Sequence, residues 1–185
     1  DGNIRIGLAK DSLLSTDWTL FDNWDLMYYG NGADAYQLWL ANVKSSAPDY
    51  SSLPEGTLTT NGVLEAYTNT LAGLATVSSK AEVIAAIQTI EEEKAKVEAN
   101  IAAWAAYQAA LVKGKATAAD GALVGEDKDI LADYVDLDAE DVLTALAMTT
   151  EEITSETEKL LTMIDNAVKN GITEGADVTD KYLVN

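Results

Sequence analysis

Residues 79–111 read SKAEVIAAIQTIEEEKAKVEANIAAWAAYQAAL, and this stretch predicts one long helix around which the rest of the chain is arranged. Its apolar residues recur at alternating steps of four and three, which is the repeat of one face of an α-helix. At ~1.5 Å per residue such a helix is roughly 50 Å long, so several shorter helices can pack along it. The predicted buried face consists of Val83, Ile87, Ile90, Val97, Ile101, Trp104 and Leu111, and the polar Lys94 and Gln108 complete the repeat.

The start of this helix is marked by Ser79 and, three residues later, by Glu82. This spacing is that of a capping box, in which each side chain accepts a hydrogen bond from the backbone N–H of the other residue. Beyond the long stretch the chain becomes rich in Ala, Gly and Thr, and we expect the helix to fray into a connection over residues 113–125. Gly121 and Gly125 are the expected stops within this connection.

Two shorter helices are predicted before the long one, over residues 33–44 and 61–76, because their apolar residues also recur at steps of three and four. The segment between them, residues 45–60, contains both prolines of the chain together with Ser, Gly and Thr, which is the composition of a loop. A loop of this length is near the upper limit for a compact domain, so we expect it to pack across the helices through Tyr50 and Leu53. The apolar faces consist of Tyr36, Trp39, Leu40 and Val43 in the first helix and Leu64, Tyr67, Leu71 and Leu74 in the second.

Two short helices are predicted after the glycine-containing connection. The first covers residues 127–135. The second is expected to begin at Asp138, whose side chain can cap a helix, with Asp141 three residues later.

The last helix has a well-marked start, because Thr149 and Glu152 have the spacing of a second capping box. Met148 and Ile153 occupy the two positions of a hydrophobic staple around it. We expect the helix to end just before Gly171, which would adopt the left-handed conformation that glycine reaches most easily. Its predicted buried stripe consists of Ile153, Leu160, Leu161, Ile164 and Val168.

The two ends of the chain follow a different pattern. Apolar and polar residues alternate along residues 3–9 and 18–29, and this period of two predicts a β-hairpin whose turn spans residues 11–17. We therefore predict a mainly α fold, a bundle of about four principal helices with short extra helices and an N-terminal β-hairpin. The predicted organisation is a hairpin unit over residues 1–30, a helical bundle over residues 31–171, and a linker with the candidate first strand of a following domain over residues 172–185.

Composition excludes several classes of function. The 185-residue chain has 12 Lys and Arg against 31 Asp and Glu, and a surface with a net charge of −19 repels nucleic acids and anionic lipids. It contains no His and no Cys, which removes imidazole and thiolate metal ligands, thiolate nucleophiles and the usual catalytic triads. We therefore expect no catalytic residue, no metal, no cofactor and no nucleic-acid partner.

The sequence also bears on membranes and on processing. No stretch approaches the ~20 consecutive apolar residues of a membrane-spanning helix, so we expect no direct membrane insertion. The chain begins with Asp1 and not with Met, and we expect it to be a processed or excised piece of a longer polypeptide.

Both ends of the chain resemble parts of a known fold. The N-terminal run, Ile4–Gly30, reads IRIGLAKDSLLSTDWTLFDNWDLMYYG and resembles the closing strands of the galactose-binding-like jelly rolls in large secreted and surface proteins of gut anaerobes. A glycine-containing strand there leads to a tryptophan and an Asp-Asn pair. The C-terminal run, Asp177–Asn185, reads DVTDKYLVN and resembles the opening strand of the next such jelly roll.

The middle of the chain is similar to the FIVAR-like helical bundle modules that such proteins place between sandwich domains. The similarity lies in the tyrosine-bearing helix over residues 61–76, the helix capped by Ser79, and the pair Trp104 and Tyr107. The resemblance implies a multidomain secreted or cell-surface protein whose neighbouring domains bind carbohydrate. It supplies no functional residue for this chain.

Two clusters of side chains invite a sharper interpretation. Alternating aromatic residues near the N-terminus could form a platform for a sugar ring, but aromatic residues on strands more often belong to a core, and we favour a core. An acidic cluster could bind calcium, but it lacks the glycine and the twelve-residue spacing of an EF-hand loop, and we favour a solvated helix start. The aromatic residues are Trp18, Trp24, Tyr28 and Tyr29, and the acidic ones are Asp136, Asp138, Glu140 and Asp141.

Polar residues of the long helix are open to two interpretations as well. Residues 91–93 are three consecutive glutamates, which we interpret as a solvent-exposed face because acid catalysis by paired carboxylates needs a cleft and a raised pKa. Lys94 and Gln108 could form a buried polar contact that fixes helix register. We favour a lysine stem that lies along the bundle with its amine at the edge.

These observations favour a non-catalytic structural or spacer module of a multidomain extracellular or cell-surface protein. Its expected partners are the neighbouring domains of the same polypeptide, and it could help to bind a glycan or a surface protein. The alternative is an accessory fragment of a glycoside-active enzyme. A polar cleft with two carboxylates at the separation used by glycosidases would favour the enzyme, and a closed bundle would favour the spacer.

Overall fold

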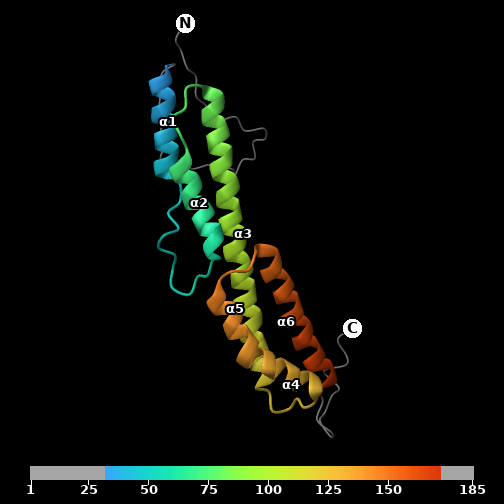
Figure 1. Ribbon diagram of the computed structural model, residues 1–185. Helices are drawn as coiled ribbons and strands as arrows, with labels where there is room; N and C mark the ends of the chain where they lie inside the picture. Colours follow the sequence, from blue (N-terminus) through green and yellow to red (C-terminus); the bar gives the residue numbers. More distant parts are fainter. Residues whose placement is uncertain (1–31, 172–185) are drawn as a thin grey trace, which may run out of the picture.

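The computed structural model describes residues 32–171, which form an elongated helical body (Figure 1). No strand occurs within this range. The predicted mainly α class is confirmed, while the predicted β-hairpin and the strand after residue 171 lie outside the described residues. The elements are α1 (Ala33–Ser46), α2 (Asn61–Gly73), α3 (Lys80–Ala118), α4 (Glu126–Asp133), the π-helical turn η1 (Tyr134–Asp138), α5 (Ala139–Ala145) and α6 (Thr150–Asn170).

Helix α3 is the axis of the molecule. It has 39 residues and is about 58 Å long at ~1.5 Å per residue. Helices α1 and α2 pack along its first half, and α4, α5 and α6 pack along its second half (Figure 1). Helices α1, α3 and α6 run in the same direction, and α2 and the α4–α5 segment run back (Figure 1). The chain therefore forms two three-helix units that share α3.

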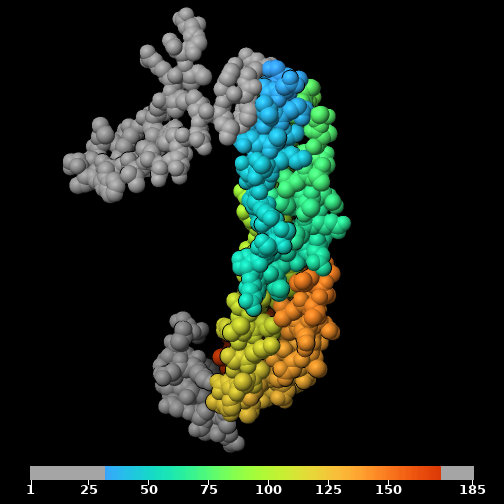
Figure 2. All heavy atoms as spheres, turned by 90° about the vertical axis from the view of Figure 1, so that its left-hand side faces the viewer, coloured from blue at the N-terminus to red at the C-terminus, as the bar shows by residue number. Residues whose placement is uncertain are grey.

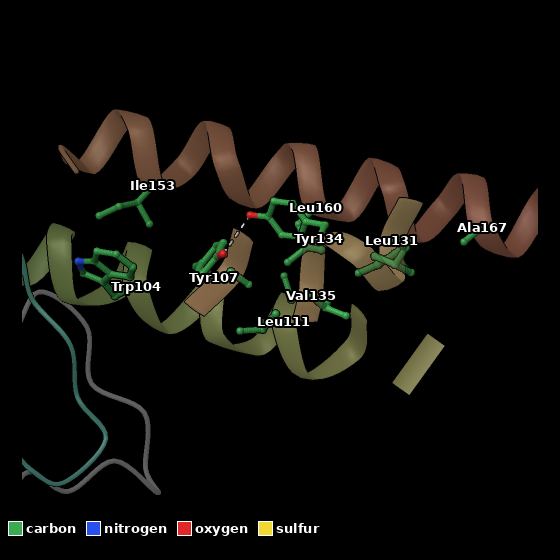
Figure 3. Close-up of a cluster of buried hydrophobic side chains, with 12 residues drawn as sticks. Trp104, Tyr107, Leu111, Leu131, Tyr134, Val135, Ile153, Leu160 and Ala167 are labelled. Carbon is green, nitrogen blue, oxygen red and sulfur yellow. Dashed lines mark hydrogen bonds between the residues drawn. The ribbon is translucent and has the colours of Figure 1, made fainter. Parts of the chain in front are cut away.

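Each unit has its own buried cluster. The predicted helical, bundle-like character is confirmed, and its core is divided because α1 and α2 have only 14 and 13 residues and are too short to reach the second half of α3. The space-filling view shows the same succession, with blue to green atoms of the first unit followed by yellow to orange atoms of the second (Figure 2). The first cluster consists of Leu40, Val77, Val83 and Ala86. The second consists of Trp104, Tyr107, Ala110, Leu111, Leu131, Tyr134, Val135, Ala139, Ile153, Leu160, Ile164 and Ala167 (Figure 3).

The start of α3 differs in one bond from the predicted capping box. The hydroxyl oxygen of Ser79 accepts a hydrogen bond of 3.3 Å from the N–H of Glu82, as predicted. The Glu82 carboxylate, however, accepts its bond of 2.6 Å from the N–H of Ser78, one residue before the expected donor. The cap therefore involves the three residues Ser78, Ser79 and Glu82. The hydrogen bonds that the Glu82 carboxylate accepts hold its pKa below the ordinary value.

The buried face of α3 agrees in part with the prediction. The helix is unbroken, and Trp104 is fully buried, as predicted. Ile101 is only half-buried, and the fully buried positions beside Trp104 are Asn100 and Tyr107. The buried face in the second half of α3 therefore runs from Val97 through Asn100, Trp104 and Tyr107 at steps of three and four. Asn100 and Tyr107 each lie one position before the predicted residues 101 and 108.

The end of α3 lies beyond the predicted fraying point. The helix continues to Ala118, and Gly114 is buried within it. A Cβ atom on Gly114 would lie 3.1 Å from Cγ1 of Val135 and 3.2 Å from Cδ1 of Leu160. Gly114 therefore does not break the helix but allows η1 and α6 to approach it closely. Gly125 lies at the other end of the connection, just before α4, and its φ of 126° is a conformation that favours glycine.

The segment from α4 to α5 is one continuous helical run, which corrects the prediction of two separately capped helices. Asp138 has helical backbone angles and its side chain forms no capping hydrogen bond. The π-helical turn adds one residue, so the buried face moves from position 138 to Ala139 and both Tyr134 and Val135 stay buried. The run ends at Leu146, which has a left-handed φ of 44°.

Helix α6 begins as predicted. Glu152 donates its N–H to the Thr149 hydroxyl oxygen over 3.2 Å, and the Glu152 carboxylate accepts from the Thr149 N–H over 2.8 Å. Ile153, Leu160 and Ile164 are buried as predicted, whereas the predicted Leu161 and Val168 are 41% and 39% exposed, and Thr157 and Ala167 take their place.

The end of α6 corrects a further prediction. Gly171 has φ of −90° and is not left-handed. It is buried, and a Cβ atom there would collide with the carbonyl oxygen of Ala167. A glycine is therefore required at this position because the carbonyl oxygen of Ala167 leaves no room for a Cβ atom, and not because of the backbone conformation.

Replacing Trp104 with Ala should lower the free energy of unfolding by about 3–5 kcal/mol, because a fully buried indole is lost and a cavity remains. The matched control is Val112→Ala on the same helix, where the side chain is 70% exposed and the expected change is within about 0.5 kcal/mol. Urea unfolding followed by circular dichroism measures both. Equal effects of the two substitutions would contradict the assigned core.

Two glycine substitutions separate helix propensity from packing. Gly62→Ala in α2 should raise the free energy of unfolding by up to about 1 kcal/mol, because nothing lies within 4 Å of the added methyl group. Gly114→Ala gains the same propensity, but overpacking against Val135 and Leu160 costs about 1–3 kcal/mol, so the net change should be a loss. Thermal unfolding of both variants tests this, and a stabilised Gly114→Ala variant would refute the close approach.

Candidate functional site: the joint between the two units

The two units meet near the middle of α3, at a site we call the joint. The segment between α1 and α2, residues 47–60, is called the joint loop; it extends past the start of α2 to the level of α5 (Figure 1). The joint therefore brings together the joint loop, α3 and the turn between α5 and α6.

Thr60 lies at the centre of the joint. Its hydroxyl donates to the carbonyl oxygen of Met148 over 2.6 Å. The same oxygen accepts from Nε1 of Trp104 and from Nδ2 of Asn100, both over 3.2 Å. A hydroxyl group has one donor and two lone pairs, so Thr60 uses its full hydrogen-bonding capacity.

Asn100 faces Thr60 from α3 and is fully buried. Its Oδ1 atom accepts from the N–H of Thr60 over 2.8 Å and from the hydroxyl of Thr59 over 3.2 Å. Its Nδ2 atom donates to Thr60 and, over 3.1 Å, to the hydroxyl oxygen of Thr150 at the start of α6. All four hydrogen bonds available to an amide side chain are formed, which offsets the cost of burying it.

Further contacts surround this buried pair. The hydroxyl of Tyr50 donates to Oε1 of Glu98 over 3.3 Å, and Nε2 of Gln108 donates to the carbonyl oxygen of Gly56 over 3.1 Å. Leu58 packs against the cluster of the second unit. The joint loop thus follows α3 from residue 98 to residue 108, about 15 Å along the helix axis.

The predicted packing of this loop is confirmed for Tyr50, whose ring packs against that of Tyr67 in a T-shaped arrangement with 5.1 Å between the ring centres. Leu53, the other predicted contact, is half-buried. Gln108 is half-buried and bonds to the loop, so the polar position that the repeat singled out does form a specific contact. Lys94 instead pairs with Glu91 over 3.4 Å on the surface of α3.

A second polar network lies inside the second unit (Figure 3). The hydroxyl groups of Tyr107 and Tyr134 are 3.0 Å apart, and Tyr134 donates to Oε1 of Glu156 over 2.7 Å. Because Tyr134 has only one hydroxyl proton, Tyr107 must be the donor in the first bond. Nζ of Lys159 completes the network, 2.9 Å from the Glu156 carboxylate and 5.0 Å from the centre of the Tyr134 ring.

The network shifts the pKa values of its members. Burial is the main cause that raises the pKa of Tyr107 and Tyr134 above the ordinary tyrosine value, so both remain protonated donors. Burial also acts to raise the pKa of Glu156, but hydrogen bonds from Lys159 and Tyr134 and the charge of Lys159 outweigh it. The pKa of Glu156 therefore lies below its ordinary value.

A cavity of about 390 Å³ lies on the first unit and is lined by the end of α1, the start of the joint loop and α2. Its volume is in the lower part of the range of small-molecule sites. The hydroxyl groups of Tyr50, Tyr67 and Thr68 on its wall are already donated to other groups of the protein. Burial and the nearby carboxylate of Glu98 raise the pKa of Tyr50 to about 12. These three hydroxyls are not free to orient a ligand, and we assign no ligand to this cavity.

Among the candidate sites weighed from the sequence, those within residues 32–171 do not assemble into a ligand site. Within residues 32–171, no group of three or more acidic residues is placed to hold a metal ion, and the acidic cluster at residues 136–141 is exposed apart from Ala139. Glu91 and Glu92 are exposed, and Glu93 pairs with Lys96. The aromatic residues between positions 18 and 29 lie outside the described part of the chain.

Comparison with known proteins finds no family model, no curated protein and no solved structure that matches this chain. None of the helices within residues 32–171 combines the length and the apolar character needed to cross a membrane.

Glu156→Gln should make the free energy of unfolding less dependent on pH in the acidic range. Because the pKa of Glu156 is lowered in the folded state, the ionised carboxylate stabilises the fold fully above the unfolded-state pKa of about 4.3, and this contribution disappears as the pH falls through the lower folded-state pKa. The difference in free energy of unfolding between the parent chain and the variant should therefore shrink between about pH 5 and pH 3. Urea unfolding at a series of pH values measures it.

Glu158→Gln, on the exposed side of the same helix, is the matched control, because it removes one carboxylate that is not part of the network. A difference between the parent chain and Glu156→Gln that is the same at pH 3 and pH 7 would show that the network does not stabilise the carboxylate.

Proposed function

We propose that this chain is a non-catalytic spacer module of a multidomain secreted or cell-surface protein. The observation that carries the proposal is the position of the two ends of the described chain. Helix α1 begins beside the start of α3, and α6 ends beside the end of α3 (Figure 1). Segments attached before α1 and after α6 would therefore be held at opposite ends of the molecule.

Specific contacts fix each end. At the first end, the side chain of Gln37 donates a hydrogen bond to the carbonyl oxygen of Val77, just before α3 begins. At the other end, Nδ2 of Asn170 donates to the Asp127 carboxylate over 2.7 Å, close to the turn that follows α3. The separation of the ends is therefore set by the length of α3, about 58 Å.

A folded spacer differs from a flexible linker in the spread of distances and not in their mean. A flexible chain of as many residues as the described part would have a root-mean-square end-to-end distance of roughly 60–70 Å, but with a broad distribution. The helical module gives a similar distance through a continuous helix. Its advantage as a spacer would be a defined separation.

The glycoside-active alternative needs two carboxylates in a shielded cleft. A cavity of about 310 Å³ on the second unit has Asp136 and Glu140 on its wall, together with Lys115. Both carboxylate side chains are exposed to solvent, whereas the acid of a glycosidase lies in apolar surroundings. This geometry supports the spacer over the enzyme fragment.

The test places one fluorescent protein before residue 32 and another after residue 171. Small-angle scattering and time-resolved energy transfer should report well-separated reporters with a narrower spread of distances than a flexible linker gives, because α3 sets the separation. The same reporters joined by a Gly/Ser linker of equal length provide the control. Incubation of the full chain with a panel of polysaccharides should release no reducing ends, and either adjacent reporters or turnover would overturn the proposal.

A further inference from the structure

We infer that the joint loop is a splint that locks the two three-helix units into one rigid body. The module would then fix the relative orientation of the segments at its two ends as well as their separation. That consequence rests on the proposed spacer function, but the rigidity is a property of the chain itself.

The joint needs such a lock because the two cores are separate. The first cluster lies around Val83 and Ala86 on α3, and the second begins at Trp104. Among the helices within residues 32–171, only α3 contributes to both clusters, and units connected in this way move relative to each other unless a substantial interface holds them. A helix on its own bends when only one side of it is packed.

The joint loop is anchored on both sides of this gap. In the first unit the hydroxyl of Tyr67 donates to the carbonyl oxygen of Pro48 over 2.8 Å. In the second unit Leu58 packs against the core, and the side chain of Gln108 donates a hydrogen bond to the carbonyl oxygen of Gly56. A bend at the joint must therefore displace the loop from one of the two units.

The centre of the splint cannot slide without leaving buried polar groups unpaired. Thr60 and Asn100 use every donor and acceptor of their side chains, and their partners come from the joint loop, α3 and the start of α6. Movement of one unit relative to the other breaks several of these bonds together. Such a buried network therefore favours one relative arrangement of the two units over slightly shifted ones.

Backbone strain at the same place supports the inference independently. Leu146 is the one non-glycine residue within residues 32–171 that has a positive φ. Its carbonyl oxygen accepts a hydrogen bond of 3.2 Å from the N–H of Asn61, the first residue of α2. Strained conformations persist where surrounding contacts determine them, and here the contact runs from the second unit to the first.

The experiment measures distances between spin labels, which is straightforward because the chain has no cysteine. One pair, Ala41→Cys and Ser155→Cys, puts an exposed label on each unit. The expected result is a narrow distance distribution in the parent chain. Thr60→Val, which removes the central hydroxyl, should widen it at least about twofold, as expected when one body becomes two linked bodies.

The matched control is Thr68→Val, because that hydroxyl donates to the carbonyl oxygen of Leu64 within its own helix and should not affect the width. A second label pair within the second unit, Lys115→Cys and Ser155→Cys, should stay narrow in Thr60→Val and shows that this unit remains folded. If Thr60→Val does not fold, the double variant Tyr50→Phe and Gln108→Ala removes the outer bonds of the splint and should also widen the distribution.

A parent distribution that is already as wide as that of Thr60→Val would overturn the inference, and so would equal widths for Thr60→Val and Thr68→Val. These outcomes are distinct from failure of the proposed function. A jointed module could still keep its ends apart, and a rigid one could still prove to have a function other than spacing.

Discussion

The burial of the Asn100 amide is the constraint on which the arrangement of the two units depends. A buried amide destabilises a fold unless all of its donors and acceptors are paired. Two of the partners of Asn100 are threonines that are distant in sequence. Thr60, 40 positions away, lies in the joint loop, and Thr150, 50 positions away, lies at the start of α6. A single polar side chain on α3 thus determines where both segments must lie, and the path of the loop and the position of α6 follow from it.

The second unit depends on how closely its helices approach. Gly114 lets Val135 and Leu160 reach the surface of α3, and the π-helical turn keeps Tyr134 and Ala139 on the buried side of a continuous helical run. These features reinforce each other, because the shift in phase also carries the Tyr134 hydroxyl to the carboxylate on α6. A methyl group at position 114 or a regular α-helical turn at η1 would disturb the same contacts.

Local signals in the sequence predicted the helices well. The repeat of three and four located α3, and the spacing of Thr149 and Glu152 located the start of α6, because both depend only on neighbouring residues. Considering apolar residues alone selected position 101 in place of Asn100, since the burial of a polar residue depends on partners that are distant in sequence. The composition of residues 113–125 indicated fraying for the same reason: the low helix propensity of Gly114 is local, whereas its close contacts with Val135 and Leu160 are not. The packing of the joint loop across the helices was predicted, through Tyr50, but the contacts of Thr60 with Asn100 and Trp104 could not be, because they depend on a loop conformation that no repeat encodes.

The common direction of α1, α3 and α6 has a mechanical consequence. Tension applied between the start of α1 and the end of α6 would pull α1 along one end of α3 and α6 along the other, each parallel to the helix beside it (Figure 1). Side-chain contacts along a pair of helices that slide in this way are loaded simultaneously, whereas helices that are peeled apart lose their contacts one turn at a time. The topology of this chain therefore converts a pull along its axis into shear, the loading direction in which interlocked side chains share the force.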